Sequence, residues 1–540
     1  MKSQESNRQH ANEVEKGIAA SAGIVGLGTL VSRVLGFIRD MLLAGIFGAS
    51  FTADAFYVAF RIPNLLRELF AEGSMSAAFV PVFTEYLTNK GKDEARQLAR
   101  ATFTAILCIV SAVVTLGMAF SPHIVSIIAP GFLNDLEKFQ LTATLTRVMF
   151  PFLLFISLSA LAMGMLNSTR HFATPAFSSA VYNIVNISMI AGLAPFLQTP
   201  VLAASLGVVL GGLAQFLMQV PALKKEGLAF SPKKPTWPVH PGVVKMGRLI
   251  LPTILGLSVT QVNLLINTFL ASFLPLGSVS YLYFGMRLIH FPLGIFAVAL
   301  STALLPTLSL QAAKGDFTAL GRSFSFSLRM VFFITFPALF GLILFRVPIV
   351  HLLFEHGQFD RTATLGTADA VLFYALGLWA FAGIRVVVPV FYALQDTKTP
   401  VKIALIAMIL NIVLNIVLMF PLQHRGLALA TSLSATFNFL SLLWILRKRN
   451  IWKQGYRIWS SHTKVILSSI IMYIPAYWLT RQEVWQTQGA LTIKIVSLAA
   501  AIIVSMAAYM LLQILLKSEE ARFVIQTLKD RTFRNGATHP

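Results

Sequence analysis

Runs of about 20 apolar residues recur along nearly the whole chain, and they constrain the fold more than any other feature of the sequence. A helix of that length crosses the hydrocarbon core of a bilayer. With 56% hydrophobic and 12% charged residues and a mean hydropathy of +0.73, the 540-residue chain cannot keep its apolar surface in water. We therefore predict an all-α, polytopic membrane protein without a sizeable soluble domain.

Taking each apolar run as one span predicts about 14 transmembrane helices. The polar N-terminal segment has no apolar core ahead of a cleavage site, so we expect the first helix to act as an uncleaved insertion signal. The predicted spans lie near residues 22–48, 54–83, 101–121, 142–167, 176–196, 201–222, 249–275, 280–310, 328–346, 366–394, 403–421, 427–446, 463–480 and 490–516.

The connections between these spans alternate in basic content, as the positive-inside rule predicts. The net charge of +21 is therefore mainly a matter of topology, which argues against nucleic-acid binding and places both termini in the cytoplasm. The basic connections carry Lys90, Lys92, Arg96, Arg100, Arg170, Lys224, Lys225, Lys233, Lys234, Lys245, Arg248, Lys314, Arg322, Lys398, Lys402, Arg447, Lys448, Arg449, Lys453 and Arg457, and the others only Lys138, Arg361, Arg425 and Arg481.

An internal duplication divides the chain. Residues 54–81 align with 280–306, so that Tyr57 meets Tyr283 and Arg61 meets Arg287, on either side of a proline-rich stretch that excludes a continuous helix. Such repeats are typical of transporters, whose substrate sites lie near the repeat interface. The predicted parts are a cytoplasmic tail (1–20), an N-lobe of about six helices (21–222), a cytoplasmic linker (223–248), a similar C-lobe (249–448), an extra helix pair (449–516) and a cytoplasmic tail (517–540).

Charged residues inside the first two spans and in the repeated stretch have two interpretations: closed ion pairs that fix helix packing, or a polar cavity for a substrate. Asp40 and Glu68 are interpreted as ion-pair partners. Both interpretations stay open for Arg33 and Arg61. The remaining cations are interpreted as lining a cavity: Arg39, Arg67 and Arg287. Because guanidinium is always charged and binds phosphate or carboxylate through two hydrogen bonds, several such groups predict an anionic ligand, and a diphosphate suits them best.

Three stretches resemble signature sequences of the MurJ (MviN) family: "SRVLGFIRD", "TADAFYVAFRIPNLLRELFAEGSMSAAFVPVF" and "FYALQDTKTPVKIA". The resemblance extends from about residue 21 to 516. It implies a flippase that moves lipid II, the undecaprenyl-diphosphate-linked peptidoglycan precursor, outward across the bacterial inner membrane by alternating access. It also implies a fold of 14 helices in two lobes with a central cationic cavity, typical of the multidrug/oligosaccharidyl-lipid/polysaccharide exporter superfamily.

Carried over by position, the resemblance makes Arg33, Arg39, Arg67 and Arg287 essential arginines. It makes Asp40 and Glu72 acids that help to close the cavity on one side, and Asp54 a further sensitive acid. Arg61 stands where the family often has lysine, and the acid that some members place before the equivalent of Arg287 is absent. The last two helices resemble a pair that forms a groove for the prenyl tail, although lipid-facing packing explains their sequence equally well.

The sequence lacks the motifs of other classes of membrane protein. No G-x-x-x-x-G-K-[ST] loop of an ATP-driven pump is present, and no two histidines stand three or four residues apart as helix-borne metal ligands do. We therefore expect a transporter rather than an enzyme, without metal or other cofactor, and acting as a monomer. Other cell-wall synthesis proteins are candidate partners. The main rival is a cation-coupled drug exporter, or an exporter of another polyprenyl-linked oligosaccharide, of the same superfamily.

The driving force of transport is the property that the sequence indicates least strongly. Neutral oxygens of two apolar helices could hold a sodium ion, but hydrogen bonding between helices is the alternative interpretation. The sequence does not distinguish sodium, protons or membrane potential as the driving force. The candidate ion ligands are Thr260, Gln261, Asn263, Asn411 and Asn415.

Overall fold

The computed structural model describes residues 2–69, 74–228, 240–452, 455–474, 477 and 491–536. Within these ranges every regular element is helical, which confirms the predicted all-α fold. Packing divides the chain into two compact units, Met1–Leu276 and Gly277–Pro540. Each unit is described separately below.

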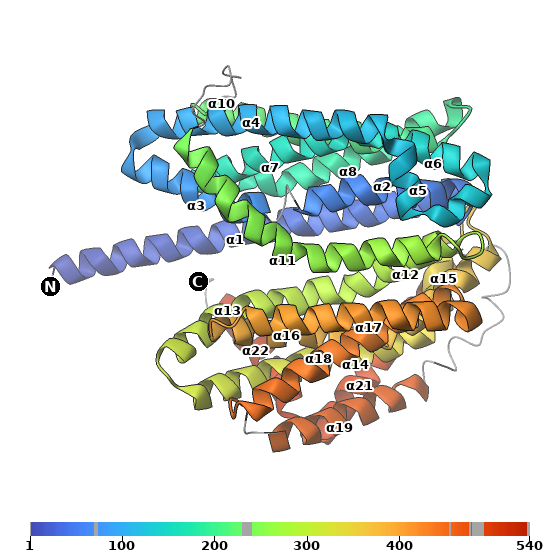
Figure 1. Ribbon diagram of the computed structural model, residues 1–540. Helices are drawn as coiled ribbons and strands as arrows, with labels where there is room; N and C mark the ends of the chain where they lie inside the picture. The colour runs from blue at the N-terminus through green and yellow to red at the C-terminus, as the bar shows by residue number, and fades with distance from the viewer. Residues whose placement is uncertain are drawn as a thin grey trace. The chain divides into compact units, whose positions relative to one another are not determined.

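In the first unit, α1 packs along α8, α8 packs on α9, and α2 packs on α6 (Figure 1). The long α11 lies against α3. The helices are α1 (Lys2–Phe47), α2 (Phe51–Leu66), α3 (Ser74–Asn89), α4 (Gly91–Ala119), α5 (Ser121–Ile128), η2 (Pro130–Asn134), α6 (Leu136–Met149), α7 (Phe152–Ser168), α8 (Ala173–Leu193), η3 (Ala194–Phe196), α9 (Val201–Leu217), α10 (Val220–Lys225) and α11 (Pro241–Ala271).

In the second unit, α14 packs against α13, α15, α16 and α19, and α17 pairs with α18. Its helices are α12 (Ser278–Pro292), η4 (Leu293–Ala297), α13 (Val298–Ala313), α14 (Phe317–Phe354), α15 (Arg361–Ala375), α16 (Leu378–Ala393), α17 (Lys398–Leu422), α18 (His424–Lys448), α19 (Gly455–Ile471), α21 (Leu491–Leu515) and α22 (Glu519–Gly536).

The duplicated stretches have the same local structure in both units. In the first, α2 runs into a π-helical turn at residues 67–69, and α3 carries Pro81 in its interior. In the second, α12 runs into the π-helical segment η4, and α13 carries Pro306. A π-turn inserts an extra residue and commonly marks a functional site in a helix. Each copy of the repeat therefore breaks its predicted span in the middle.

Eight helices among the described residues are long and apolar enough to cross a membrane, and the pair α15 and α16, bent by 43°, makes a ninth if counted as one span. The predicted number of about 14 spans is not confirmed. The predicted spans 54–83 and 280–310 are split by π-turns, and parts of 463–480 lie outside the described residues. In α1, three charges interrupt the apolar run: Arg33, Arg39 and Asp40.

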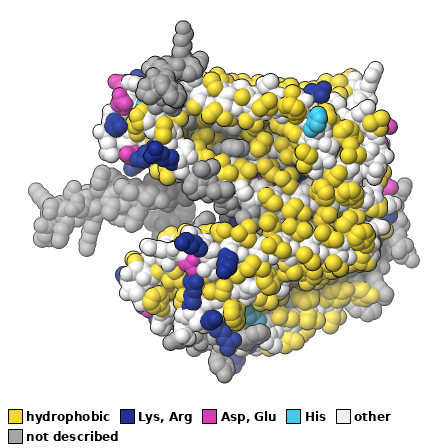
Figure 2. Space-filling view, viewed as in Figure 1, with side chains coloured by type: hydrophobic (Ala, Val, Ile, Leu, Met, Phe, Trp, Pro, Cys, Tyr) yellow, Lys and Arg dark blue, Asp and Glu magenta, His cyan; other side chains and the backbone are white. Residues whose placement is uncertain are grey.

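The outer surface is apolar over much of the face visible in Figure 2, as contact with lipid requires. On α21 the arrangement is inverted relative to a soluble helix, because its buried face carries polar side chains and its exposed face is aliphatic. The polar, buried positions include Lys494, Ser505, Tyr509 and Gln513. This pattern fits a helix that packs on its neighbours through hydrogen bonds and faces hydrocarbon outward.

The predicted lobe boundary in the linker 223–248 differs from the boundary between the compact units. The helix after the linker, α11, packs on α3, α4 and α5, so the compact units divide after Leu276. The lobe assignment rests on the sequence repeat and stays a prediction. Residues 229–239 of the linker lie outside the described residues.

Candidate functional site

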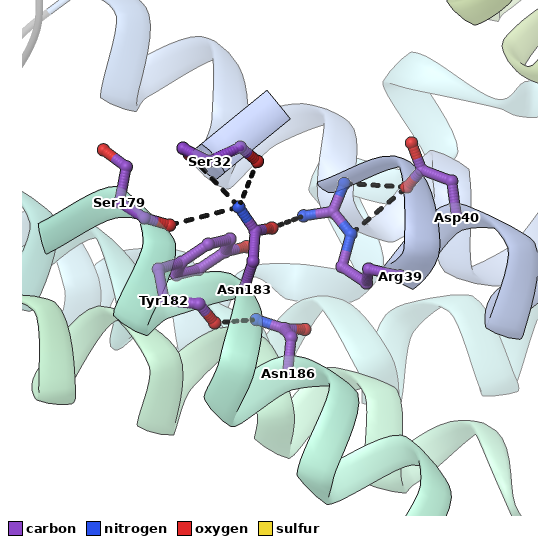
Figure 3. A network of polar contacts seen from close by, with 7 residues as sticks. All are labelled: Ser32, Arg39, Asp40, Ser179, Tyr182, Asn183 and Asn186. Carbon is purple, nitrogen blue, oxygen red and sulfur yellow. Dashed lines mark hydrogen bonds and ion pairs between the residues drawn. The ribbon is translucent and has the colours of Figure 1, made fainter. Parts of the chain in front are cut away.

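A charged pair lies inside α1, where the chain should cross the membrane (Figure 3). Arg39 donates from Nε and Nη2 to Oδ1 of Asp40, over 3.1 Å and 2.8 Å. The Asp40 side chain is fully buried and that of Arg39 is 14% exposed. Two donors of one guanidinium meet a single carboxylate oxygen, which makes a short, charge-assisted contact. The remaining guanidinium nitrogen, Nη1, points to α8.

The partner on α8 is Asn183, whose Oδ1 accepts from Arg39 Nη1 over 3.3 Å (Figure 3). The amide group of Asn183 donates in turn to the carbonyl oxygens of Ser32 and Ser179, each over 3.1 Å. The ring of Tyr182 lies 6.0 Å from the Arg39 guanidinium carbon, within range of a cation–π contact. These contacts tie α1 to α8 and orient Arg39. Sequence reasoning missed Asn183, although an asparagine in an apolar run was the available signal.

A second cluster surrounds Arg67 at the π-turn that follows α2. Arg67 Nε donates to Asn64 Oδ1 over 3.1 Å, and its Nη2 lies 3.7 Å from Glu68. Glu68 also accepts from Asn64 and from Gln261 of α11. The side chains of Arg67 and Glu68 are 22% and 34% exposed. A partly exposed guanidinium at this position can bind an anion through its planar array of donors.

Two further predicted residues have partners within the first unit. Arg61 donates from Nε to the Thr268 hydroxyl of α11 over 3.0 Å. Asp54 pairs with Lys138 over 3.1 Å, and both side chains are buried, at 2% and 9% exposed. The sequence predicts Lys138 in an outer connection, whereas it lies in the first turn of α6 and its ammonium group stands 4.1 Å from the Phe132 ring centroid. No sequence signal linked Lys138 to Asp54.

The other predicted residues are placed as follows. Arg33 is exposed on α1 and makes no hydrogen bond or ion pair with another described residue. Arg287 is half-buried on α12, in the second unit. Glu72 and the side chain of Thr260 lie outside the described residues. Arg39, Arg61 and Arg67 therefore belong to the first unit and Arg287 to the second.

The candidate ion ligands fall into separate groups. Asn411 and Asn415 are fully buried on α17, joined by a 2.9 Å hydrogen bond, and Asn411 also donates to Ser434 of α18 over 3.3 Å. In the first unit, the side-chain amide of Gln261 donates a hydrogen bond to Glu68. The Oδ1 atom of Asn263 is buried without a hydrogen-bond partner among the described residues. The hydrogen bond from Asn411 to Ser434 joins two helices, as expected if these asparagines serve helix packing rather than sodium binding.

Comparison with known proteins identifies the family. The family model described as lipid II flippase MurJ matches residues 43–500. A probable lipid II flippase MurJ of Vibrio cholerae is 39% identical over 79% of this chain and 83% of its own length. The chain belongs to the lipid II flippase MurJ family. A MurJ from Burkholderia cenocepacia is 37% identical over 89% of this chain and 93% of its own length.

Solved structures agree with this assignment. A lipid II flippase MurJ in an inward closed conformation matches with a TM-score of 0.76 and 27% identity, covering 90% of this chain and 98% of that one. An inward-facing multidrug transporter of the MATE family matches with a TM-score of 0.66 over 78% of this chain and 96% of that one, at 12% identity, and so shares the fold alone. The predicted resemblance to the MurJ family is confirmed, and the rival drug exporter is not favoured. As a MurJ family member, the chain is a multi-pass inner-membrane protein.

Proposed function

We propose that this protein moves lipid II from the cytoplasmic to the outer leaflet of the inner membrane by alternating access. The observation that carries the proposal is membership of the MurJ family together with arginines held inside membrane helices. A charged side chain at the bilayer centre costs about 2.5 to 3.5 kcal/mol on insertion scales. Such a cost is commonly tolerated where the charge binds a substrate or lines its path.

Arg39, Arg67 and Arg287 bind the diphosphate of the substrate in this account. Their planar guanidinium groups can each grip two phosphate oxygens, which a lysine ammonium cannot do. In the described state Arg39 is held by Asp40 and Asn183. A phosphate can take over one of these contacts, because the guanidinium then exchanges one oxygen partner for another, and the buried Asp40 carboxylate needs a new donor when the phosphate replaces it.

Asp40 acts as a gating acid in this proposal, because it holds Arg39 when no phosphate is present. Asp54, Glu72 and Arg61 are proposed to stabilise one closed state. Asn183 orients Arg39 from α8. The protein then works as a transporter without a covalent step and without a cofactor, as a monomer with both termini in the cytoplasm.

Coupling to sodium, protons or membrane potential drives the cycle. Asn411 and Asn415 are the candidate ligands in the second unit, and Thr260 and Asn263 those in the first. Lipid II transport in proteoliposomes under imposed sodium, proton and potential gradients identifies the driving force. Transport that is equal with and without each gradient would remove the ion site from the proposal.

Arginine substitutions at matched, folded amounts test the binding role. We expect Arg39→Ala and Arg67→Ala to abolish lipid II binding, and Arg39→Lys and Arg67→Lys to weaken it, because lysine keeps the charge and loses the bidentate geometry. Arg322→Ala is the control, since this exposed arginine lies in the second turn of α14, in a predicted cytoplasmic connection. Wild-type affinity in all alanine variants would place the diphosphate elsewhere.

A further inference from the structure

Arg385 is a charged residue inside the membrane region that the predicted site does not include. It lies in the middle of α16, with seven residues of the helix before it and eight after it. At 1.5 Å per residue, about 10 to 12 Å of helix separates it from either end. Its side chain is exposed and, among the described residues, makes no hydrogen bond or ion pair.

The face of α16 that carries Arg385 is unlike the faces that meet lipid. Only Arg385 and Tyr392 are exposed on this helix, and they stand seven residues apart, on one side of it. On α17, by contrast, the large side chains exposed after Lys402 are all apolar, and Ile409, Val417 and Phe420 among them are 59 to 78% exposed. The two exposed side chains of α16 thus each end in a polar group, while the rest of the helix is buried or half-buried, which fits a surface that meets water or a polar ligand.

Hydrocarbon is an unfavourable environment for this position. Guanidinium stays protonated in proteins, so Arg385 cannot avoid the desolvation penalty by losing its charge. Snorkelling serves charges at the ends of a span, and Arg385 lies about two turns inside the C-terminal end of the bent span formed by α15 and α16. Pro389 adds a second polar group here, since it has no N–H to bond the carbonyl oxygen of Arg385. The Arg385 guanidinium and its backbone carbonyl oxygen therefore both favour contact with water.

The position of α16 links Arg385 to the repeated element of the second unit. The helix packs against η4, the π-helical segment that directly follows the helix carrying Arg287. Ala297 of η4 lies in one hydrophobic cluster with Val386 and Val387, the residues that follow Arg385. Arg287 and Arg385 therefore stand on two helices that border the same π-segment.

We propose that Arg385 faces water in the transport path and binds an anionic phosphate or carboxylate group of the substrate headgroup. The water-facing part stands on the structure, and the substrate contact rests on the proposed function. Arg385 would be a second cation of this unit beside Arg287, and Tyr392 lies on the same face two turns away.

Thiol labelling tests exposure to water. In a Cys108→Ser background, Arg385→Cys should react in membrane vesicles with a charged, membrane-impermeant methanethiosulfonate reagent, because the reacting thiolate forms in water and not in hydrocarbon. Ile409→Cys is the matched control, as an exposed position on the apolar face of α17. Arg385→Cys that stays unlabelled, like Ile409→Cys, in both permeabilised and intact vesicles would overturn the proposal.

Binding measurements test the substrate contact with a milder change. Arg385→Gln should weaken lipid II binding by roughly tenfold or more, the usual loss for a hydrogen bond to a charged group, while Arg322→Gln should not. Undecaprenyl diphosphate is the second ligand. An equal loss for both ligands assigns Arg385 to the diphosphate, and a loss for lipid II alone assigns it to a headgroup carboxylate.

The failures are distinguishable. Arg385→Gln with wild-type affinity for both ligands would overturn the substrate contact and leave the proposed function intact. Wild-type protein that binds neither ligand would overturn the proposed function and the contact together, and the labelling result would still decide whether Arg385 faces water.

Discussion

The buried pair of Asp54 and Lys138 makes a quantitative prediction about stability. The pair joins α2 to α6 over 3.1 Å with side chains 2% and 9% exposed. Removing one member of a buried ion pair leaves a desolvated charge, which typically costs about 3 to 5 kcal/mol. Lys138→Met keeps the apolar stem and its packing on Phe132 while deleting the charge. We expect this variant to lose about that free energy of unfolding.

The assay is a double-mutant cycle in mixed micelles, with unfolding followed by titration with a denaturing detergent. Asp54→Asn with Lys138→Met removes both charges, and neutral replacement of a buried pair is often close to neutral in stability. The double variant should therefore be more stable than Lys138→Met alone, with a coupling energy of at least about 2 kcal/mol. Additive losses would refute the reasoning, because they would mean that the two side chains stabilise the fold independently.

Three further predictions follow from other contacts. Asn183→Leu should lower lipid II affinity, since it removes the α8 partner of Arg39; binding at matched amounts of folded protein checks this, and unchanged affinity counts against an orienting role. Gly28→Val should reduce folded yield, because an added Cβ would lie 2.7 Å from the Ala176 carbonyl oxygen; normal yield would contradict close α1–α8 packing. Hydrogen bonds from Thr399, together with Arg449, lower the pKa of Asp396 to about 2, so the stability lost in Asp396→Asn should be constant above about pH 5 and vanish as the pH falls from about 4 toward 2; a difference that persists at pH 2 would contradict it.

The fold class was predictable because membrane insertion depends on the local composition of the sequence. Apolar length and loop charge need no knowledge of which helices touch, and they are enough to predict the all-α fold that the described residues show, although the number of spans is not confirmed. The repeat also appeared in sequence, and the two π-turns share its register. The turns themselves were not predicted, because no residue type specifies a π-helix.

Partners across helices were harder to predict. The Arg39–Asp40 contact joins neighbours in sequence, yet of the two residues the sequence predicts only Asp40 as an ion-pair residue and places Arg39 in a cavity. Asn183 lies 144 residues from Arg39, and Lys138 lies 84 residues from Asp54. A single sequence gives the periodicity of each helix and not the face that a distant helix presents to it. The same gap explains why α11 packs with the helices before the linker and was assigned to the lobe after it.

Translocation of labelled lipid II in proteoliposomes tests the central claim most directly. Vesicles loaded with the wild-type protein should move the precursor across the bilayer, and vesicles with matched, folded Arg39→Ala protein should not, while Arg322→Ala protein should transport as the wild type does. Transport by Arg39→Ala at the wild-type rate would contradict the binding account, and absence of transport by the wild type under every imposed gradient would contradict the flippase function itself.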